Sequence, residues 1–256
     1  MIVRDAVDKY DQPVYQLIFQ TAHAHVSGRF AEAWGAEPFI ELPCRFNTLP
    51  AIYHHDDGWD QWDPLPRVDP QTGRPMSFLD MPHIEAESIW RHSIEAVAPW
   101  GPLAQYIVAR HFSILRSESA SAKTPGGIAF LHHYQQKCEF WLAQWLVSDR
   151  DRTKERAQRA LDELRFFDWL SLWFCMAERS EPHQMETPDK IPLDIVPLGA
   201  GRFEISPWPW KVNEIDLSIM AREIPAKSYA SDEQLQQEQG RITTLRWELV
   251  PGKRSY

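Results

Sequence analysis

The densest group of metal-capable side chains lies within residues 51–59, where two histidines and two aspartates are consecutive. Imidazole nitrogens and carboxylate oxygens together suit a divalent transition ion such as manganese, iron, zinc or nickel. Adjacent positions on a helix diverge by about 100°, so His55 and Asp56 can both reach an ion that lies between them. Magnesium is a further candidate if carboxylates and water dominate the ligand set.

Polar side chains on three other helical patterns give this doublet its partners. His23, His111 and Asp168 each lie on a face that is otherwise largely apolar. A carboxylate in an apolar stripe is costly unless it is paired or bound to a metal. Each side chain taken alone is also explained as a satisfied core or surface group. Taken together, they predict a metal site whose ligands are His23, His55, Asp56, His111 and Asp168.

Proton transfer and phosphate binding need further groups beside this site. His54 and Asp57 flank the doublet and are the candidates for taking a proton from a water molecule. Arg74 lies in the long, proline-rich loop at residues 59–82 and is the candidate for neutralising charge on a phosphate. A solvated loop charge explains Arg74 equally well.

Six helical patterns are expected to position these residues, and the spacing of apolar side chains defines them. They cover residues 20–34, 50–58, 84–97, 103–116, 130–147 and 152–176. The last two are joined by a short polar stretch and should form a helical hairpin. A short strand is expected at residues 14–19, before the first helix.

The composition of the chain changes near residue 178. Residues 182–209 are rich in proline and have no helical period, and short strands are expected at 202–206, 213–224 and 241–250. The sequence therefore predicts a mostly α fold that is α+β overall. Residues 1–184 would form a helical bundle, and residues 185–256 a small β-containing annex packed on it.

The charge and the cysteines narrow the class of protein. The formal net charge of −9 argues against duplex nucleic acid or an anionic membrane as partner, because both are bound through clustered basic residues. A local basic pocket for a phosphate is still allowed. Three widely spaced cysteines are not a disulfide framework, and no signal peptide or membrane span is expected. We therefore expect a cytoplasmic protein, and the sequence leaves a homo-oligomer open.

The order of the candidate ligands carries a resemblance. His23, then His55-Asp56, then Asp168 resembles the signature of the HD superfamily of metal-dependent phosphohydrolases. The resemblance implies an all-helical bundle, a divalent metal and, through His111, a place for a second ion. The lysine that follows many such doublets is absent, and Asp57 stands in its place.

A closer resemblance covers nearly the whole chain. Its motifs lie at residues 20–24, 55–59, 73–75, 110–112 and 167–172. They resemble an uncharacterised bacterial family, a domain of unknown function, and this resemblance implies no activity.

Three functions from different classes remain open. The first is a metal-dependent hydrolase that acts on a small phosphoester or nucleotide. The second is an HD-type di-iron oxygenase that uses the same ligands. The third is a non-catalytic binding or assembly module that keeps a relic site. For an enzyme, the expected partner is a small-molecule substrate carrying a phosphate.

Overall fold

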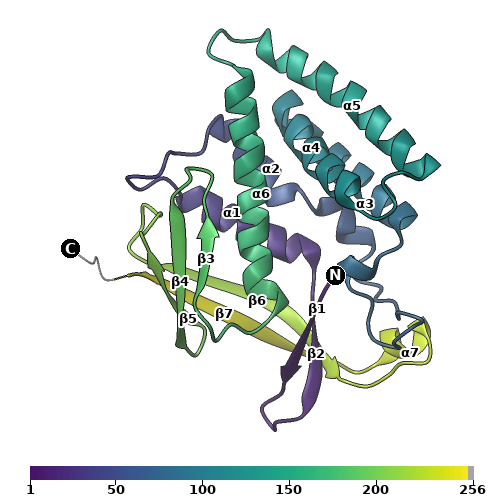
Figure 1. Cartoon of the computed structure of the whole chain (residues 1–256). Helices are drawn as coiled ribbons and strands as arrows, with labels where there is room; N and C mark the ends of the chain where they lie inside the picture. The colour runs from purple at the N-terminus through teal and green to yellow at the C-terminus, as the bar shows by residue number, and fades with distance from the viewer. Residues whose placement is uncertain (253–256) are drawn as a thin grey trace.

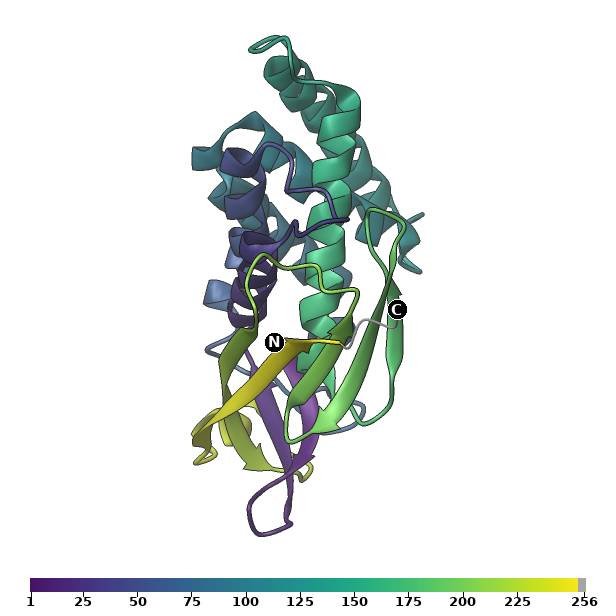
Figure 2. The same ribbon diagram turned by 90° about the vertical axis from the view of Figure 1, so that its left-hand side faces the viewer.

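The computed structural model describes residues 1–252 and has two layers, a group of helices and a curved β-sheet (Figure 1). Figure 2 shows the helices stacked above the sheet, with the molecule elongated along α6 (Lys154–Met176). This helix runs from the far end of the helical layer down to the sheet. It therefore connects the two layers.

The sheet contains seven strands in the order β1-β2-β6-β7-β5-β4-β3 and is curled like half of a barrel. Neighbouring strands are antiparallel except for β5 and β7, which are parallel. The strands are β1 (Ile2–Val7), β2 (Pro13–Ile18), β3 (His183–Glu186), β4 (Pro192–Gly199), β5 (Arg202–Ser206), β6 (Ile215–Pro225) and β7 (Arg241–Pro251). Strands from both ends of the chain thus share one sheet.

The predicted mostly α, HD-domain-like bundle with a small annex is wrong, and so is an all-α class. The fold is 46% helical and 22% strand, and the sheet forms a complete layer. β2, β5, β6 and β7 match predicted strands, whereas β1, β3 and β4 were missed. Pro192 opens β4, and Pro197 lies at an irregularity in its register. Proline is tolerated at such positions, so a proline-rich segment can still form a strand.

The helices confirm the six predicted helical patterns, four of them closely. The fifth, α5, begins five residues earlier than the predicted range of 130–147. The second, α2, begins and ends a few residues earlier than expected. The helices are α1 (Gln20–Ala33), α2 (Arg45–His54), α3 (His83–Ala96), α4 (Pro102–Glu118), α5 (Pro125–Leu146), α6 and α7 (Asp232–Gln237). Three 3-10 turns accompany them: η1 (Asp57–Gln61), η2 (Phe78–Asp80) and η3 (Ala98–Trp100).

Threonine side chains begin the two long helices of the predicted hairpin. Thr124 accepts a hydrogen bond from the N–H of Gly127 at the start of α5. Thr153 accepts one from the N–H of Arg156 at the start of α6. Each cap satisfies a backbone donor that the first helical turn leaves without a partner.

Aromatic side chains on α6 join the helical layer to the sheet. The ring of Phe174 lies 5.0 Å from that of Phe203 on β5 and 5.9 Å from that of Trp247 on β7. About two turns earlier, the ring of Phe167 lies 5.2 Å from that of Trp34, which follows α1. Because each ring buries a large apolar area, these contacts hold α6 in a defined position between α1 and the sheet.

The division of the chain into residues 1–184 and 185–256 stays a prediction, although the sheet draws strands from both sides of it. Within residues 1–252, no helix combines the length and the hydropathy needed to cross a bilayer.

Candidate metal centre

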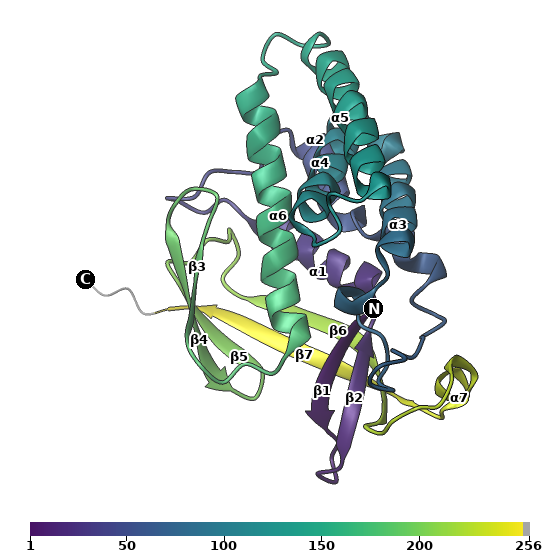
Figure 3. The same ribbon diagram turned by 45° about the vertical axis from the view of Figure 1, so that its right-hand side comes forward.

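Four helical segments bring the five predicted metal ligands close together. His23 lies on α1, His111 on α4 and Asp168 on α6, while His55 and Asp56 follow the last residue of α2. α2 and α6 each contact both α1 and α4, so the four segments surround one point (Figure 3). The side chains are buried, and that of Asp168 is the most accessible at 14% exposed.

The His-Asp doublet lies in a tight turn rather than inside a helix. His55 still has helical backbone angles, but Asp56 has φ −112° and ψ 17° and ends the helical path. Gly58 follows, and its N–H donates to Oγ of Ser93 at 3.0 Å. A Cβ at Gly58 would clash with the carbonyl oxygen of Ile89 on α3. The absence of a side chain therefore lets the turn approach α3 and sets the direction of the doublet.

Four ligand atoms face one another across a small central space. Nε2 of His23 lies 3.0 Å from Oδ2 of Asp56 and 3.6 Å from Oδ1 of Asp168. Nε2 of His55 lies 3.3 Å from Oδ1 of Asp168 and 3.7 Å from Oδ2 of Asp56. The ligand atoms of His23, His55 and Asp168 all lie within 4.8 Å of one another, whereas Asp56 is outside this group and approaches only the two histidines. Each imidazole thus faces two carboxylates.

The backbone fixes one nitrogen of His55. Its Nδ1 lies 2.8 Å from the carbonyl oxygen of Ile52, which can only accept, so Nδ1 carries a proton. Nε2 then aims either a lone pair or a second proton at the carboxylates. Burial lowers the pKa of His55, but Asp56 and Asp168 outweigh this effect and raise it to about 9. A positive charge, from a proton or from a metal ion, therefore belongs between His55 and the carboxylates.

Two serines hold His23 in place from the opposite side. Nδ1 of His23 lies 2.7 Å from Oγ of Ser171, and this hydroxyl donates to the carbonyl oxygen of Asp168 at 3.0 Å. With its proton so used, Oγ of Ser171 accepts from Nδ1–H of His23. Oγ of Ser27 lies 2.7 Å from that of Ser171. In this tautomer of neutral His23, the lone pair of Nε2 is directed at the carboxylates, which is the form that binds a metal.

His111 approaches the other oxygen of Asp168. Its Nε2 lies 3.7 Å from Oδ2 of Asp168, which is too long for a hydrogen bond. Burial lowers the pKa of His111 to about 4, so the ring is neutral near pH 7. Burial would raise the pKa of Asp168, but its hydrogen bond to His55 and the charges of the neighbouring histidines hold it well below its ordinary value. Neutral imidazole and ionised carboxylate are both competent ligands.

The predicted proton-transfer residues form a pair beside the doublet. Nδ1 of His54 lies 2.8 Å from Oδ2 of Asp57, and both side chains are partly exposed. The ring of His54 is stacked on that of Trp100, with centroids 4.4 Å apart. Asp57 can therefore orient His54, and Trp100 fixes the plane of the ring.

Arg74 is not brought to this cluster. Its guanidinium donates to both carboxylate oxygens of Asp5 on β1, at 2.8 and 2.9 Å, and lies over the ring of Tyr15 on β2. These contacts join the loop after η1 to the β1–β2 hairpin. They account for Arg74 as a structural residue of this edge of the sheet.

Ser171, Ser27 and the carbonyl of Ile52 were not among the predicted site residues. The sequence did hold a signal for the serines. Ser27 lies four residues after His23, and Ser171 three residues after Asp168, so each shares a helix face with a ligand. No comparable pattern identifies a carbonyl group that accepts from a histidine.

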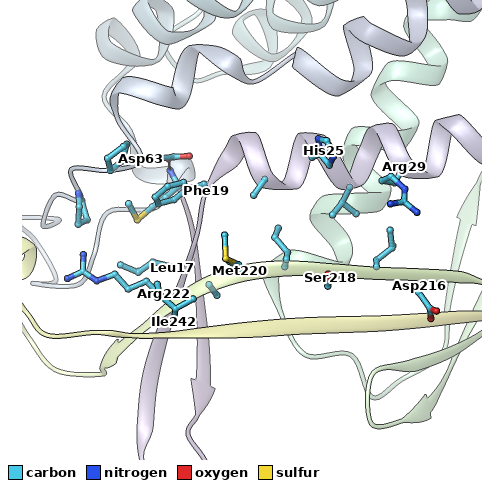
Figure 4. A pocket seen from close by; sticks show the side chains of 18 residues that line it. Leu17, Phe19, His25, Arg29, Asp63, Asp216, Ser218, Met220, Arg222 and Ile242 are labelled. Carbon is cyan, nitrogen blue, oxygen red and sulfur yellow. Dashed lines mark ion pairs between the residues drawn. The ribbon is translucent and has the colours of Figure 1, made fainter.

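A large cavity lies on the other side of α1 from the cluster. It has a volume of about 560 Å³, lies between α1 and β6 and has largely apolar walls (Figure 4). His25 and Arg29 line it from α1, and Ser218 and Met220 from β6. The wall contains none of the five predicted ligands. His23 and His25 thus serve opposite faces of one helix, as their spacing requires.

The chain was compared with known proteins. Residues 1–226 match a family described as a protein of unknown function (DUF3891), and the chain belongs to this family. No curated protein matches the chain. No solved structure matches it either. The family confirms the predicted membership of a domain of unknown function, whereas these comparisons do not support the HD resemblance.

Proposed function

We propose that His23, His55, Asp56 and Asp168 hold a divalent metal ion and that the protein is a metal-dependent hydrolase. The observation that carries the metal site is the orientation of His55. Its Nδ1 proton is committed to the carbonyl of Ile52, yet its Nε2 lies 3.3 Å from an oxygen of Asp168. A positive charge is needed between these two atoms, and a metal cation supplies it where a second proton on Nε2 otherwise would.

The donor set and the distances fit such an ion. At ligand distances of about 2.0–2.2 Å, the ligands of a tetrahedral ion are separated by about 3.3–3.6 Å. The four nitrogen–oxygen separations run from 3.0 to 3.7 Å. Two of the four contacts, at 3.6 and 3.7 Å, are too long for hydrogen bonds, whereas all four lie close to the separations that a shared ion imposes. Two imidazoles and two carboxylates favour manganese, iron, zinc or nickel over magnesium.

His111 decides between one ion and two. Asp168 directs Oδ1 toward His23 and His55 and Oδ2 toward His111. A carboxylate with histidines near both of its oxygens can bind one metal ion or bridge two metal ions. A stoichiometry of one ion per chain supports hydrolysis at a single centre. Two iron ions per chain would support the alternative of a di-iron oxygenase.

A bound divalent ion would polarise a phosphoryl oxygen and lower the pKa of a bound water molecule. The chain's own residues would remove the proton from the attacking water. Asp57 orients His54, whose Nε2 can then take a proton from the attacking water. The ligand order along the chain is that of the HD phosphohydrolases. This order supports a small phosphoester or nucleotide as substrate, although the fold is not the all-helical bundle that the resemblance implied.

The experiment measures phosphate release from a panel of phosphoesters and nucleotides, with manganese, iron, zinc, nickel or magnesium added to metal-depleted protein. We expect turnover with at least one transition ion and its loss in Asp168→Ala. We expect His54→Gln to lower kcat while the bound metal is retained. Absence of phosphate release under every condition, from a protein that does bind metal, would overturn hydrolysis and leave the metal site standing.

A further inference from the structure

A second large cavity opens where the curled sheet meets the end of α6. It has a volume of about 740 Å³ and lies between β1, the β4–β5 turn, β7 and the segment that follows α6. Figure 3 shows the lower end of α6 reaching the sheet between β1 and β5. A cavity of this size accommodates a small molecule rather than a macromolecule.

The wall of this cavity is strongly basic. It contains four arginines and one acidic side chain, that of Glu178. The four arginines are Arg4, Arg179, Arg202 and Arg246. They come from β1, from the segment after α6, and from β5 and β7. This concentration of positive charge stands out on a chain whose formal net charge is −9.

Arg4 is buried without a partner. The residue is 8% exposed, and its Nε has no hydrogen-bond acceptor among residues 1–252. In the same part of the chain, no carboxylate oxygen lies within 4.0 Å of its guanidinium. Glu178, which lines the same cavity, attracts Arg4 from a greater distance but forms no direct ion pair with it. A buried charge without a direct partner is costly. An anion bound in the cavity would therefore supply the direct partner that this guanidinium lacks.

Two of the other arginines are also without carboxylate partners in the described region. Arg179 donates from Nε to the carbonyl oxygen of Trp173 and lies over the ring of that residue, which fixes its guanidinium. Arg246 is exposed at the rim, with no ion pair within the described residues. Only Arg202 is neutralised, by Glu248 at 3.0 Å. Arg4, Arg179 and Arg246 thus line one cavity from three segments, with Glu178 as the acidic side chain among them.

We propose that this arginine-lined cavity binds a phosphorylated small molecule. A planar carboxylate is satisfied by one guanidinium fork, whereas the three oxygens of a phosphate accept from several forks in different directions. Phe203 and Trp247 also line the cavity and offer apolar surface to the rest of the ligand. This site is separate from the metal centre, because Asp168 and the last residue of α6 are eight positions, or about 12 Å, apart along the helix.

Calorimetric titration in chloride buffer tests the proposal, with inorganic pyrophosphate and adenosine monophosphate as probes and citrate as a polycarboxylate of similar charge. We expect both phosphates to bind the wild type and citrate to bind at least tenfold more weakly. Arg4→Met and Arg246→Gln each remove a charge-assisted contact and should each weaken phosphate binding about 10- to 100-fold.

Three controls make the outcome specific. Arg29→Gln removes an arginine from the wall of the other cavity and should leave phosphate affinity unchanged. Asp168→Ala should also retain binding, because the metal centre is not involved. Arg4→Met should unfold at the same or a higher temperature than the wild type when no ligand is present, because it removes a buried charge that has no direct ion pair. Arg246→Gln, at an exposed position, keeps the test valid if Arg4→Met does not fold.

Several results would overturn the proposal. These are no binding of either phosphate by the wild type, equal binding of citrate, or unchanged affinity in both Arg4→Met and Arg246→Gln. Loss of binding in Asp168→Ala together with retention in Arg246→Gln would place the phosphate at the metal centre instead.

Discussion

Replacement of Ser171 by alanine tests how the fold prepares His23 to bind a metal. The hydroxyl of Ser171 is fully buried and makes three contacts, at 2.7 Å to Nδ1 of His23, 2.7 Å to Oγ of Ser27 and 3.0 Å to the carbonyl oxygen of Asp168. Alanine removes a single oxygen and creates almost no cavity. The Nδ1–H of His23 then has lost its acceptor, and the ring is no longer held in one tautomer.

The size of the effect follows from these contacts. Leaving a buried donor without an acceptor costs about 1–3 kcal/mol of folding free energy. Loss of the hydrogen bond that orients a ligating histidine lowers metal affinity about 10- to 100-fold. We therefore expect Ser171→Ala to show both a modest loss of stability and a large loss of metal affinity.

The assay is calorimetric titration of metal-depleted protein with zinc or manganese, together with denaturant unfolding of the same samples. Ser113→Ala is the matched control. Ser113 is also a buried serine on a central helix, but its Oγ donates only to the carbonyl oxygen of Ala109 on the same helix. We expect this control to keep the metal affinity of the wild type. If Ser171→Ala loses stability but binds metal with unchanged affinity, His23 is not held for metal binding and the reasoning fails.

Three further predictions concern the turn, the bound ion and a buried acid. Gly58→Ala should destabilise the protein by about 1–3 kcal/mol and weaken metal binding, because the added Cβ pushes the doublet away from Ile89; unchanged denaturant midpoint and metal affinity would refute this. A chelator should lower the unfolding temperature of the metal-loaded wild type by several degrees, which corresponds to a contribution of about 3 kcal/mol from the ion. The unfolding temperature of Asp168→Ala should not change. Burial outweighs the attraction of Arg159 and raises the pKa of Glu163 to about 7 from 4.5. The folded protein then keeps a proton that the unfolded chain has released, so stability falls as the pH rises from 4.5 to about 7. Glu163→Gln lacks this contribution, and its stability relative to the wild type should rise by about 3 kcal/mol at most across the same window, as read from unfolding curves at each pH.

The sequence was most informative where helical periodicity and residue chemistry agreed. Asp168 stood out because a carboxylate interrupted an apolar stripe, and its helix does carry it into the cluster. His23 and His25 lie two positions apart, and the helix places them on opposite faces. The helix face on which a side chain lies can be predicted from its spacing in the sequence, because a helix is built from contacts within a few residues.

The sequence was least informative about the sheet. β1 pairs in the sheet with β2, and β2 in turn pairs with β6 about two hundred residues later in the chain. Such pairing leaves no local periodic signal. β4 was missed because its prolines argue against a strand, yet they lie at its first residue and at an irregular register. Arg74 was misplaced for the same reason, since its partner Asp5 belongs to the strand that was not foreseen.

The contacts that define the metal centre also lie beyond sequence patterns. The Ile52 carbonyl that fixes His55 depends on how α2 ends, and the basic cavity depends on Arg4 meeting residues from the opposite end of the chain. Residue types pointed to metal chemistry, whereas the approach of Nε2 of His55 to an oxygen of Asp168 required the folded geometry.

Anomalous diffraction from crystals of protein purified without added metal, recorded at the absorption edges of manganese, iron, nickel and zinc, tests the metal centre most directly. We expect a peak among His23, His55, Asp56 and Asp168, at about 2.0–2.2 Å from each ligand atom. The peak should be absent from crystals of Asp168→Ala. Well-ordered density in which the histidines hydrogen-bond the carboxylates directly, with no anomalous signal even after soaking in these metals, would contradict the account.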